Sequence, residues 1–314
     1  MCVYFKVMRV STVNLSPAVD RTYYTDGFCI NGVNRARLVK VNAGGKGINF
    51  AAVLGLCGAE CEALGFLGRG GEFIEEFLES RSIKSNFVHT DAPVRVNIKI
   101  CDEKNGTYTD LNENAACASG DELARLYETV EKSAEENDVL YVGGSLPYGM
   151  KTDIYKNIVE IGKKHGACTV ADASGEAMKN LLEAHPDIIK PNEKEAEEIL
   201  GTEVSDESDA LKAALKLRAA GAETVILTLG GQGAVCAAKD GVYRVISPKV
   251  TVKSTVGAGD TFLAGFLYGM KYGTETALRY AASFAAAKIV CEGTDIPCFE
   301  ALCERAGTIN VTKI

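Results

Sequence analysis

Residues 254–266 read STVGAGDTFLAGF and give the strongest structural signal in the chain. Gly257 and Gly259 permit a tight turn there, because glycine adopts φ > 0 and has no Cβ. Asp260 follows at once, and small and apolar residues continue in a helix-like run. The free N–H groups and positive dipole of a first helical turn would then meet a carboxylate. Phosphoryl transfer needs such a pairing of an anion hole with a base.

The same turn has a simpler interpretation. A G-A-G-D sequence at a helix start is often only a tight turn, with the Asp as N-cap or first-turn acid. Short glycine motifs also match by chance. Other parts of the chain therefore have to decide whether Asp260 is a cap or a catalytic base.

Composition sets broad limits on partners. The chain has 314 residues, of which 46% are hydrophobic and 24% charged, as in ordinary soluble proteins. This length allows one large α/β domain or two small ones. The net charge of −8 argues against nucleic acid or an anionic membrane as the main partner. An anionic substrate would therefore need a local cluster of cationic side chains.

The cysteines predict no metal centre. There are eleven, without a C-x-x-C pair, and only three histidines accompany them, so no zinc pattern forms. We expect free thiols in a reducing cytoplasm.

No run of 18 apolar residues predicts a membrane span, and residues 1–10 do not resemble a signal peptide. Met8 is an alternative start, which would make residues 1–7 an extension.

The second half of the chain alternates strands and helices. Strands are predicted at 139–142, 168–171 and 224–228, and helices at 152–164, 193–200 and 206–220. Continuous apolar strands alternating with helices indicate βαβ units and a parallel sheet covered on both faces. Polar residues follow the strand ends: Ser145, Asp172, Lys190, Asn192 and Thr228 to Gly233. Ligands bind at that edge of such sheets, so we expect the chemistry there.

Two segments, 18–40 and 94–111, break this alternation. Residues 94–100 alternate apolar and polar, and Asn105-Gly106 is a strong hairpin turn before a return strand at 107–111. Arg95, Asn97 and Lys99 would share one face. The pattern fits a small β-lid with a polar underside, or a plain exposed hairpin.

A second glycine turn, GGKGINFAA at residues 44–52, precedes another small-residue helix. It fits neither the Walker A pattern nor G-x-G-x-x-G. Lys46, the Asn49 amide and backbone N–H groups near one helix start can hold sugar hydroxyls or a phosphate. A purely structural turn is the alternative.

Asn192 and Glu195 also have two interpretations. In KPNEKE, residues 190–195, they form a capping-box pair that needs no ligand, or they flank a divalent cation beside ATP phosphates. Ser145 lies in GGSLP, which is not a nucleophile elbow, so we interpret it as a hydrogen-bonding residue.

Taken in order, these motifs resemble the ribokinase-like (PfkB) carbohydrate kinases over nearly the whole chain. The matching segments are residues 44–52, 144–147, 172–177, 190–195, 228–234 and 257–260. Within the family, NLSPAVDRT at 14–22 resembles the branch that acts on phosphorylated hexoses, and RVNIK at 95–99 with TDLNEN at 109–114 is most similar to its 1-phosphofructokinases. Ser16, Phe50 and Ala115 depart from the usual Asn, Val and Gly, and none removes a catalytic group.

The resemblance implies an α/β class, three-layer α/β/α ribokinase-like fold with a mostly parallel central sheet and a small β-sheet lid. The implied single kinase domain has its core at about 1–15, 41–92 and 112–314 and its lid at about 16–40 and 93–111. It implies ATP and Mg²⁺ as cofactors, a phosphorylated ketohexose as substrate, and a homodimer formed through the lids.

Site roles are likewise implied residue by residue. Asp260 is the expected base, with Gly257, Ala258 and Gly259 as anion hole. Substrate binding is expected of Asp20, Arg35, Gly45, Lys46, Asn49, Arg95, Lys99 and Ser145. ATP binding is expected of Lys190, Asn192, Thr228, Gly230 and Gly233, and Asn192 and Glu195 are expected to organise Mg²⁺ through water.

The leading hypothesis is ATP-dependent phosphorylation of fructose 1-phosphate at its 6-hydroxyl, giving fructose 1,6-bisphosphate. Tagatose 6-phosphate and fructose 6-phosphate are the rival substrates. A non-catalytic sugar-phosphate sensor is the rival from another class, against which the intact Asp260 turn argues. A dinucleotide-dependent oxidoreductase lacks its glycine fingerprint here.

Overall fold

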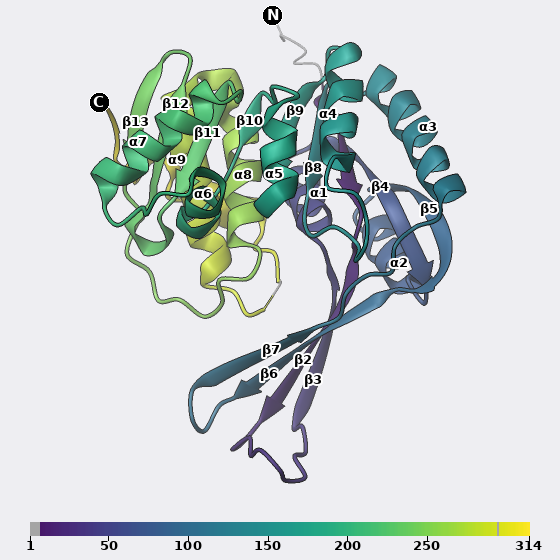
Figure 1. Cartoon of the computed structure of the whole chain (residues 1–314). Helices are drawn as coiled ribbons and strands as arrows, with labels where there is room; N and C mark the ends of the chain where they lie inside the picture. Colours follow the sequence, from purple (N-terminus) through teal and green to yellow (C-terminus); the bar gives the residue numbers. More distant parts are fainter. Residues whose placement is uncertain (1–6, 294) are drawn as a thin grey trace, which may run out of the picture.

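The computed structural model describes residues 7–293 and 295–314, so the expected extension at 1–7 lies, except for Val7, outside the described residues. Its main sheet has the order β14-β13-β12-β11-β10-β9-β8-β1-β4-β5 (Figure 1). The seven strands from β11 to β5 are parallel, and β12, β13 and β14 are antiparallel. The strands are β1 Arg9–Asn14, β4 Glu60–Arg69, β5 Lys84–Pro93, β8 Val139–Gly143, β9 Cys168–Asp172, β10 Ile188–Ile189, β11 Thr224–Thr228, β12 Ala234–Ala238, β13 Gly241–Val245 and β14 Val311–Lys313.

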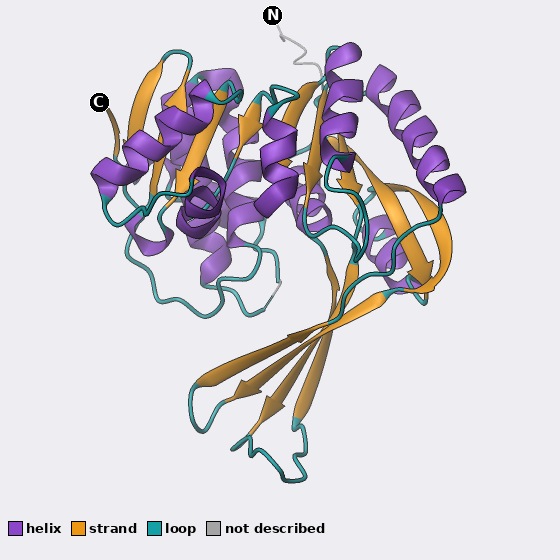
Figure 2. Ribbon diagram, in the orientation of Figure 1, coloured by secondary structure: helices purple, strands orange, loops and turns teal. Residues whose placement is uncertain are grey.

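Helices cover both faces of this sheet, as Figure 2 shows. One hydrophobic cluster joins the sheet to α1 Lys46–Leu56, α2 Glu72–Glu79, α8 Ala258–Gly269, α9 Thr274–Ile289 and α10 Phe299–Cys303. The other joins it to α3 Gly120–Glu136, α4 Ile154–Lys164, α5 Gly175–Leu182, α6 Glu193–Leu200 and α7 Glu207–Ala219. The predicted three-layer α/β/α architecture is therefore confirmed.

A second sheet projects from this body as an arm (Figure 1). It has the order β3-β2-β6-β7, formed by β2 Ala18–Thr25, β3 Leu38–Gly44, β6 Arg95–Asp102 and β7 Thr107–Asn112. The predicted hairpin is its β6–β7 pair, and β2 pairs parallel with β6. Residues 95–100 are all half-buried instead of alternating, and β7 is exposed throughout. The alternation is lost because, in the part of the chain that the structure describes, no helix layer covers either face of the arm (Figure 2).

Local sequence signals explain several boundaries. Asp206 caps α7 by accepting a hydrogen bond from the Asp209 N–H, as predicted, and α7 ends at Ala219. Strand β11 covers the predicted residues 224–228. Helix α4 begins at Ile154, two residues later than expected, because residues 152 and 153 form a turn.

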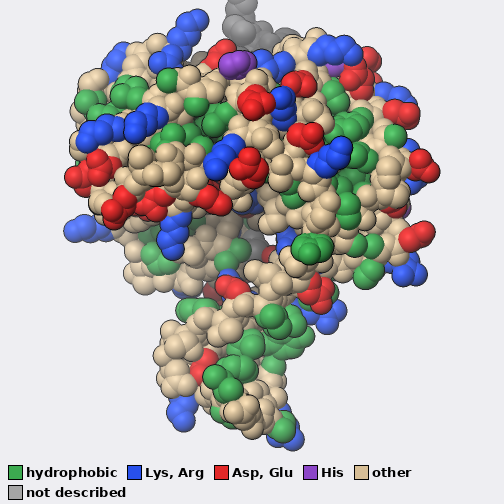
Figure 3. Space-filling model, in the orientation of Figure 1, with side chains coloured by type: hydrophobic (Ala, Val, Ile, Leu, Met, Phe, Trp, Pro, Cys, Tyr) green, Lys and Arg blue, Asp and Glu red, His purple; other side chains and the backbone are tan. Residues whose placement is uncertain are grey.

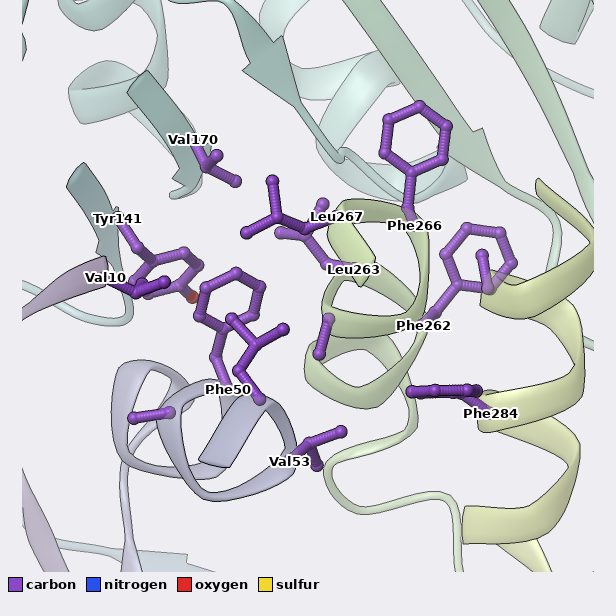
Figure 4. Close-up of a cluster of buried hydrophobic side chains, with 14 of the residues drawn as sticks. Val10, Phe50, Val53, Tyr141, Val170, Phe262, Leu263, Phe266, Leu267 and Phe284 are labelled. Carbon is purple, nitrogen blue, oxygen red and sulfur yellow. The ribbon is translucent and has the colours of Figure 1, made fainter. Parts of the chain in front are cut away.

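Helices α1 and α8, which follow the two glycine turns, pack side by side under the sheet (Figure 4). Phe50 from α1 is fully buried, and its ring stacks on Tyr141 of β8 with centroids 4.5 Å apart. Leu263 and Phe266 from α8 fill the same cluster. Because both helices are nearly apolar on all sides, they are fixed within the core, and so are the glycine turns at their N-termini.

Candidate active site

The carboxylate of Asp260 lies in the first turn of α8, and the residue is only 6% exposed. Gly257 caps this helix with φ 74°, a left-handed conformation that favours glycine. The Asn49 side chain, from the other glycine-led helix, donates a hydrogen bond of 2.9 Å from Nδ2 to Asp260 Oδ2. The two glycine turns predicted from sequence therefore meet at one carboxylate.

The pKa of Asp260 is raised to about 6. Burial is the main cause and the charge of Asp172 adds to it, whereas the Asn49 hydrogen bond and the charges of Lys46 and Lys190 oppose it. A carboxylate with a pKa near 6 is still ionised at pH 7.5, and it is a stronger base than an ordinary Asp. The environment thus suits Asp260 to accept a proton from a hydroxyl.

Two lysines converge on one buried carboxylate beside Asp260. Lys46 Nζ lies 2.9 Å from Asp172 Oδ1, and Lys190 Nζ lies 3.2 Å from Asp172 Oδ2. Burial by itself would raise the pKa of Asp172, but the charges of Lys190 and Lys46 outweigh burial and hold it below the usual value. Lys190 Nζ is also 3.1 Å from where a Cβ on Gly259 would stand. Positive charge is therefore fixed at the N-terminal end of α8.

Asn192 and Glu195 form a complete capping box at the start of α6. The Asn192 N–H donates to Glu195 Oε2 and the Glu195 N–H donates to Asn192 Oδ1, both at 2.9 Å. Glu195 Oε1 lies 3.8 Å from Lys46 Nζ, so the box borders the lysine pair. The capping role predicted as one alternative is present, and one carboxylate oxygen still faces the site.

The inner face of the arm supplies polar groups opposite the core. Asn97 Nδ2 donates to Asp20 Oδ1 at 2.8 Å, and the Asp20 carboxylate fills the space where a side chain at Gly44 would stand. Lys99 Nζ lies 3.5 Å from Asp110. A cavity of about 220 Å³ lies between this face and the loop before α8, lined by Asp20, Arg21, Thr22, Asn42, Asn97, Ile98, Lys99, Asp110, Asn112, Val256 and Gly293.

Arg95 lies where the arm joins the body. Its Nε donates to the Ser16 carbonyl at 3.0 Å and its Nη1 to the Glu113 carbonyl at 3.3 Å. Burial lowers its pKa, although it stays charged. The guanidinium therefore ties together two chain segments that cross at the base of the arm.

The remaining predicted residues are more dispersed. Thr228 ends β11 and bridges to Asn192, while Gly230 and Gly233, with φ of 50° and 111°, shape the following turn. Gly45 caps α1. Ser145 is exposed just after β8. The structure does not bring Arg35 to the cluster, because this residue lies in the exposed loop between β2 and β3.

Sequence reasoning gave no site role to two residues that the structure places in the cluster. Asp172 has a strand-end position and lies in the matching segment 172–177, but its grip on both lysines is not predicted from sequence. Asn97 is predicted on the hairpin face and lies in the matching segment 95–99, but its hydrogen bond to Asp20 is not predicted. The strand-end position of Asp172 was the signal available for it.

The model of the pfkB family carbohydrate kinases matches residues 9–301. The chain belongs to the pfkB family. The enzyme class predicted from sequence, an ATP-dependent carbohydrate kinase, is thereby confirmed.

Individual relatives agree with the family assignment. A 1-phosphofructokinase of Bacillus subtilis is 34% identical over 83% of this chain and 85% of its own length. A tagatose-6-phosphate kinase of Staphylococcus epidermidis is 34% identical with the same coverage. The structure is also similar to phosphofructokinase-2 from Escherichia coli in complex with potassium, with a TM-score of 0.89 and 26% identity over 96% of this chain and 99% of the other. The expected ribokinase-like fold is confirmed.

Proposed function

We propose that this kinase transfers the γ-phosphoryl group of ATP to the 6-hydroxyl of fructose 1-phosphate. One observation supports it above all: the buried Asp260 at the glycine-led N-terminus of α8 lies within a cluster that holds Lys46 and Lys190. A base, backbone N–H groups and two cations are what phosphoryl transfer requires. The 1-phosphofructokinase relative supports the choice of substrate.

The proposed mechanism uses the residues as follows. Asp260 accepts the proton of the sugar hydroxyl as that oxygen attacks the γ-phosphorus, and Asn49 holds the carboxylate in place. The N–H groups of the Gly257–Gly259 turn stabilise the charge on the transferring group. Asp172 keeps both lysine ammonium groups at the site without engaging the substrate. Because the transition state is loose, the protein contributes mainly positioning and charge stabilisation.

Magnesium fits this donor set through water. Within residues 7–293 and 295–314, no group of three or more His, Cys, Asp and Glu side chains could hold a metal directly. Glu195 Oε1 and Asp172 Oδ2 are carboxylate oxygens beside the lysine pair, 3.8 Å from Lys46 Nζ and 3.2 Å from Lys190 Nζ respectively. Mg²⁺ keeps several waters and takes few protein carboxylates. When bound, it would neutralise phosphate charge.

The substrate's own phosphate would bind on the arm side. Lys99 lines the cavity between arm and core, and Asp20 and Asn97 beside it suit sugar hydroxyls. Lys99 also borders a larger adjoining cavity of about 610 Å³. We expect Lys99→Met to raise KM for the sugar phosphate without changing KM for ATP.

A coupled assay of ADP release tests the substrate. Purified protein is given ATP, Mg²⁺ and either fructose 1-phosphate, tagatose 6-phosphate, fructose 6-phosphate or unphosphorylated fructose. The proposal requires the highest kcat/KM with fructose 1-phosphate. A higher value with tagatose 6-phosphate would favour the activity of the second relative. Sugar binding without turnover on any of the four would refute catalysis and leave a sensor.

We further propose a homodimer in which the arms pack face to face. The outer face of the four-stranded sheet bears exposed Val39, Val41 and Leu111, and hydrophobic side chains are visible on the arm in Figure 3. An uncovered apolar face of this kind usually marks an interface. Sedimentation of Val41→Glu should give a lighter species than the unaltered protein.

A cytoplasmic location is also proposed, since the ten cysteines of the described residues are all free. No helix within residues 7–293 and 295–314 is long and apolar enough to cross a membrane.

A further inference from the structure

Lys288, in the last turn of α9, is a buried cation that the mechanism above does not use. The residue is only 2% exposed. Burying an ammonium group is costly unless it is hydrogen-bonded or paired. Its Nζ donates to the carbonyl oxygen of Gly293 at 2.7 Å, and no carboxylate of the described chain forms an ion pair with it. Burial lowers the pKa of Lys288, and the ammonium form is favoured by this backbone dipole, by the negative end of α9 and by the charges of Asp295 and Asp260.

This lysine lies directly behind the turn of the proposed anion hole. A Cβ on Gly257 would be 3.4 Å from Lys288 Cε and 3.5 Å from Asn49 Nδ2. Asn49 is the residue that holds the Asp260 carboxylate. Lys288 and Asn49 therefore both lie against the Gly257 turn, which leads into α8.

The end of α9 also anchors both loops that border the cavity. The N–H groups of Lys253 and Ser254 donate to the Ile289 carbonyl, at 2.8 and 3.2 Å. Lys288 itself holds Gly293, which lines the cavity together with Val256. The C-terminal end of α9 thus fixes both the segment before Gly257 and the segment that contains Gly293.

We propose that Lys288 is a positioning residue for phosphoryl transfer, which links the Gly293 segment to the Gly257 turn and adds a fixed positive charge behind that turn. The inference rests on the proposed kinase function. In this proposal its ammonium acts through the Gly257 turn and not on the substrate itself. It acts by holding the backbone N–H groups in place and by strengthening the field at the transferring phosphoryl group.

A chemical rescue experiment separates this role from simple packing. Lys288→Ala leaves a space beside the Gly293 carbonyl that a small cation can enter. The exposed Lys216 on α7 provides the control, Lys216→Ala. Steady-state rates with ATP and fructose 1-phosphate are measured in choline chloride, ammonium chloride and potassium chloride at equal ionic strength. Circular dichroism and thermal unfolding of each variant are recorded in choline.

The expected result is a loss in kcat of about 10- to 100-fold for Lys288→Ala in choline, less than for removing a direct oxyanion donor. KM for ATP should change less than about threefold. Ammonium or potassium should restore at least a tenth of the lost rate, whereas the unaltered protein and Lys216→Ala should respond to neither. Lys288→Met, which fills the space with an uncharged chain, should lose rate and not be rescued.

Three outcomes would overturn the proposal. A Lys288→Met variant as active as the unaltered enzyme would make the charge irrelevant. Unfolding of both variants at 25 °C would make Lys288 a structural residue only. A folded Lys288→Ala that stays slow in every salt would leave packing as the cause. An unaltered protein that turns over none of the sugars would instead refute the proposed function, so the two failures are distinguishable.

Discussion

Asp260→Asn is predicted to destroy turnover while making the fold more stable at pH 7.5. The carboxyl has a pKa of about 6 in the folded protein against 3.8 as its ordinary value. Between these values the folded state binds the proton more tightly than the unfolded chain. The stabilisation from protonated Asp260 is therefore present below about pH 3.8 and is lost as the pH rises through about 6.

The size of the effect follows from this shift. A difference of about two pKa units corresponds to about 3 kcal/mol at most, at about 1.4 kcal/mol per unit. Unfolding entropy of about 2.1 cal/mol/K per residue then gives a rise in Tm of at most about 5 °C for a chain of this length. The Asn amide needs hydrogen-bond partners too, so we expect about 1–4 °C at pH 7.5 and almost none at pH 4.

Differential scanning calorimetry at both pH values measures this, with the exposed Asp91→Asn as the matched control. Turnover of Asp260→Asn should fall by about 10²–10⁴-fold or more, because the general base is lost. A Tm of Asp260→Asn below that of the unaltered protein at pH 7.5 would refute the inference that the buried, charged carboxylate destabilises the fold. Turnover above a tenth of normal would refute its role as base.

Three further outcomes are expected. The value of kcat/KM should fall tenfold per pH unit below about pH 6, as one proton binds Asp260, and a profile flat to pH 5 would contradict this. Asp172→Asn should lower the free energy of unfolding in urea by about 3 kcal/mol, since it leaves buried lysine charge unpaired, and adding Lys46→Met should recover part of the loss. Gly257→Ala should cost about 1–2 kcal/mol through its φ of 74° and lower kcat more than tenfold, whereas Gly149→Ala, with φ 81° and open space around it, should cost similar stability without losing activity.

The sequence by itself determined the local elements and their order. Helix α6 and strand β11 have the predicted bounds, and Asp206 is the predicted cap, because periodicity and capping depend on residues a few positions apart. The glycine turns at 44–47 and 257–259 were found for the same reason. The βαβ alternation implies a parallel sheet, and ligands bind at the carboxyl edge of such a sheet, so the sequence also predicted that edge as the place where the two turns meet.

Tertiary structure alone decided which charges meet. Lys46 and Asp172 are 126 positions apart and Asn49 and Asp260 are 211 apart, so no local pattern could pair them. Packing of α9 buried Lys288 beside the Gly257 turn, and the uncovered faces of the arm left its strands without the alternation their sequence suggested. A charge takes its role from its desolvation and its neighbours, and both are fixed only when distant segments pack together.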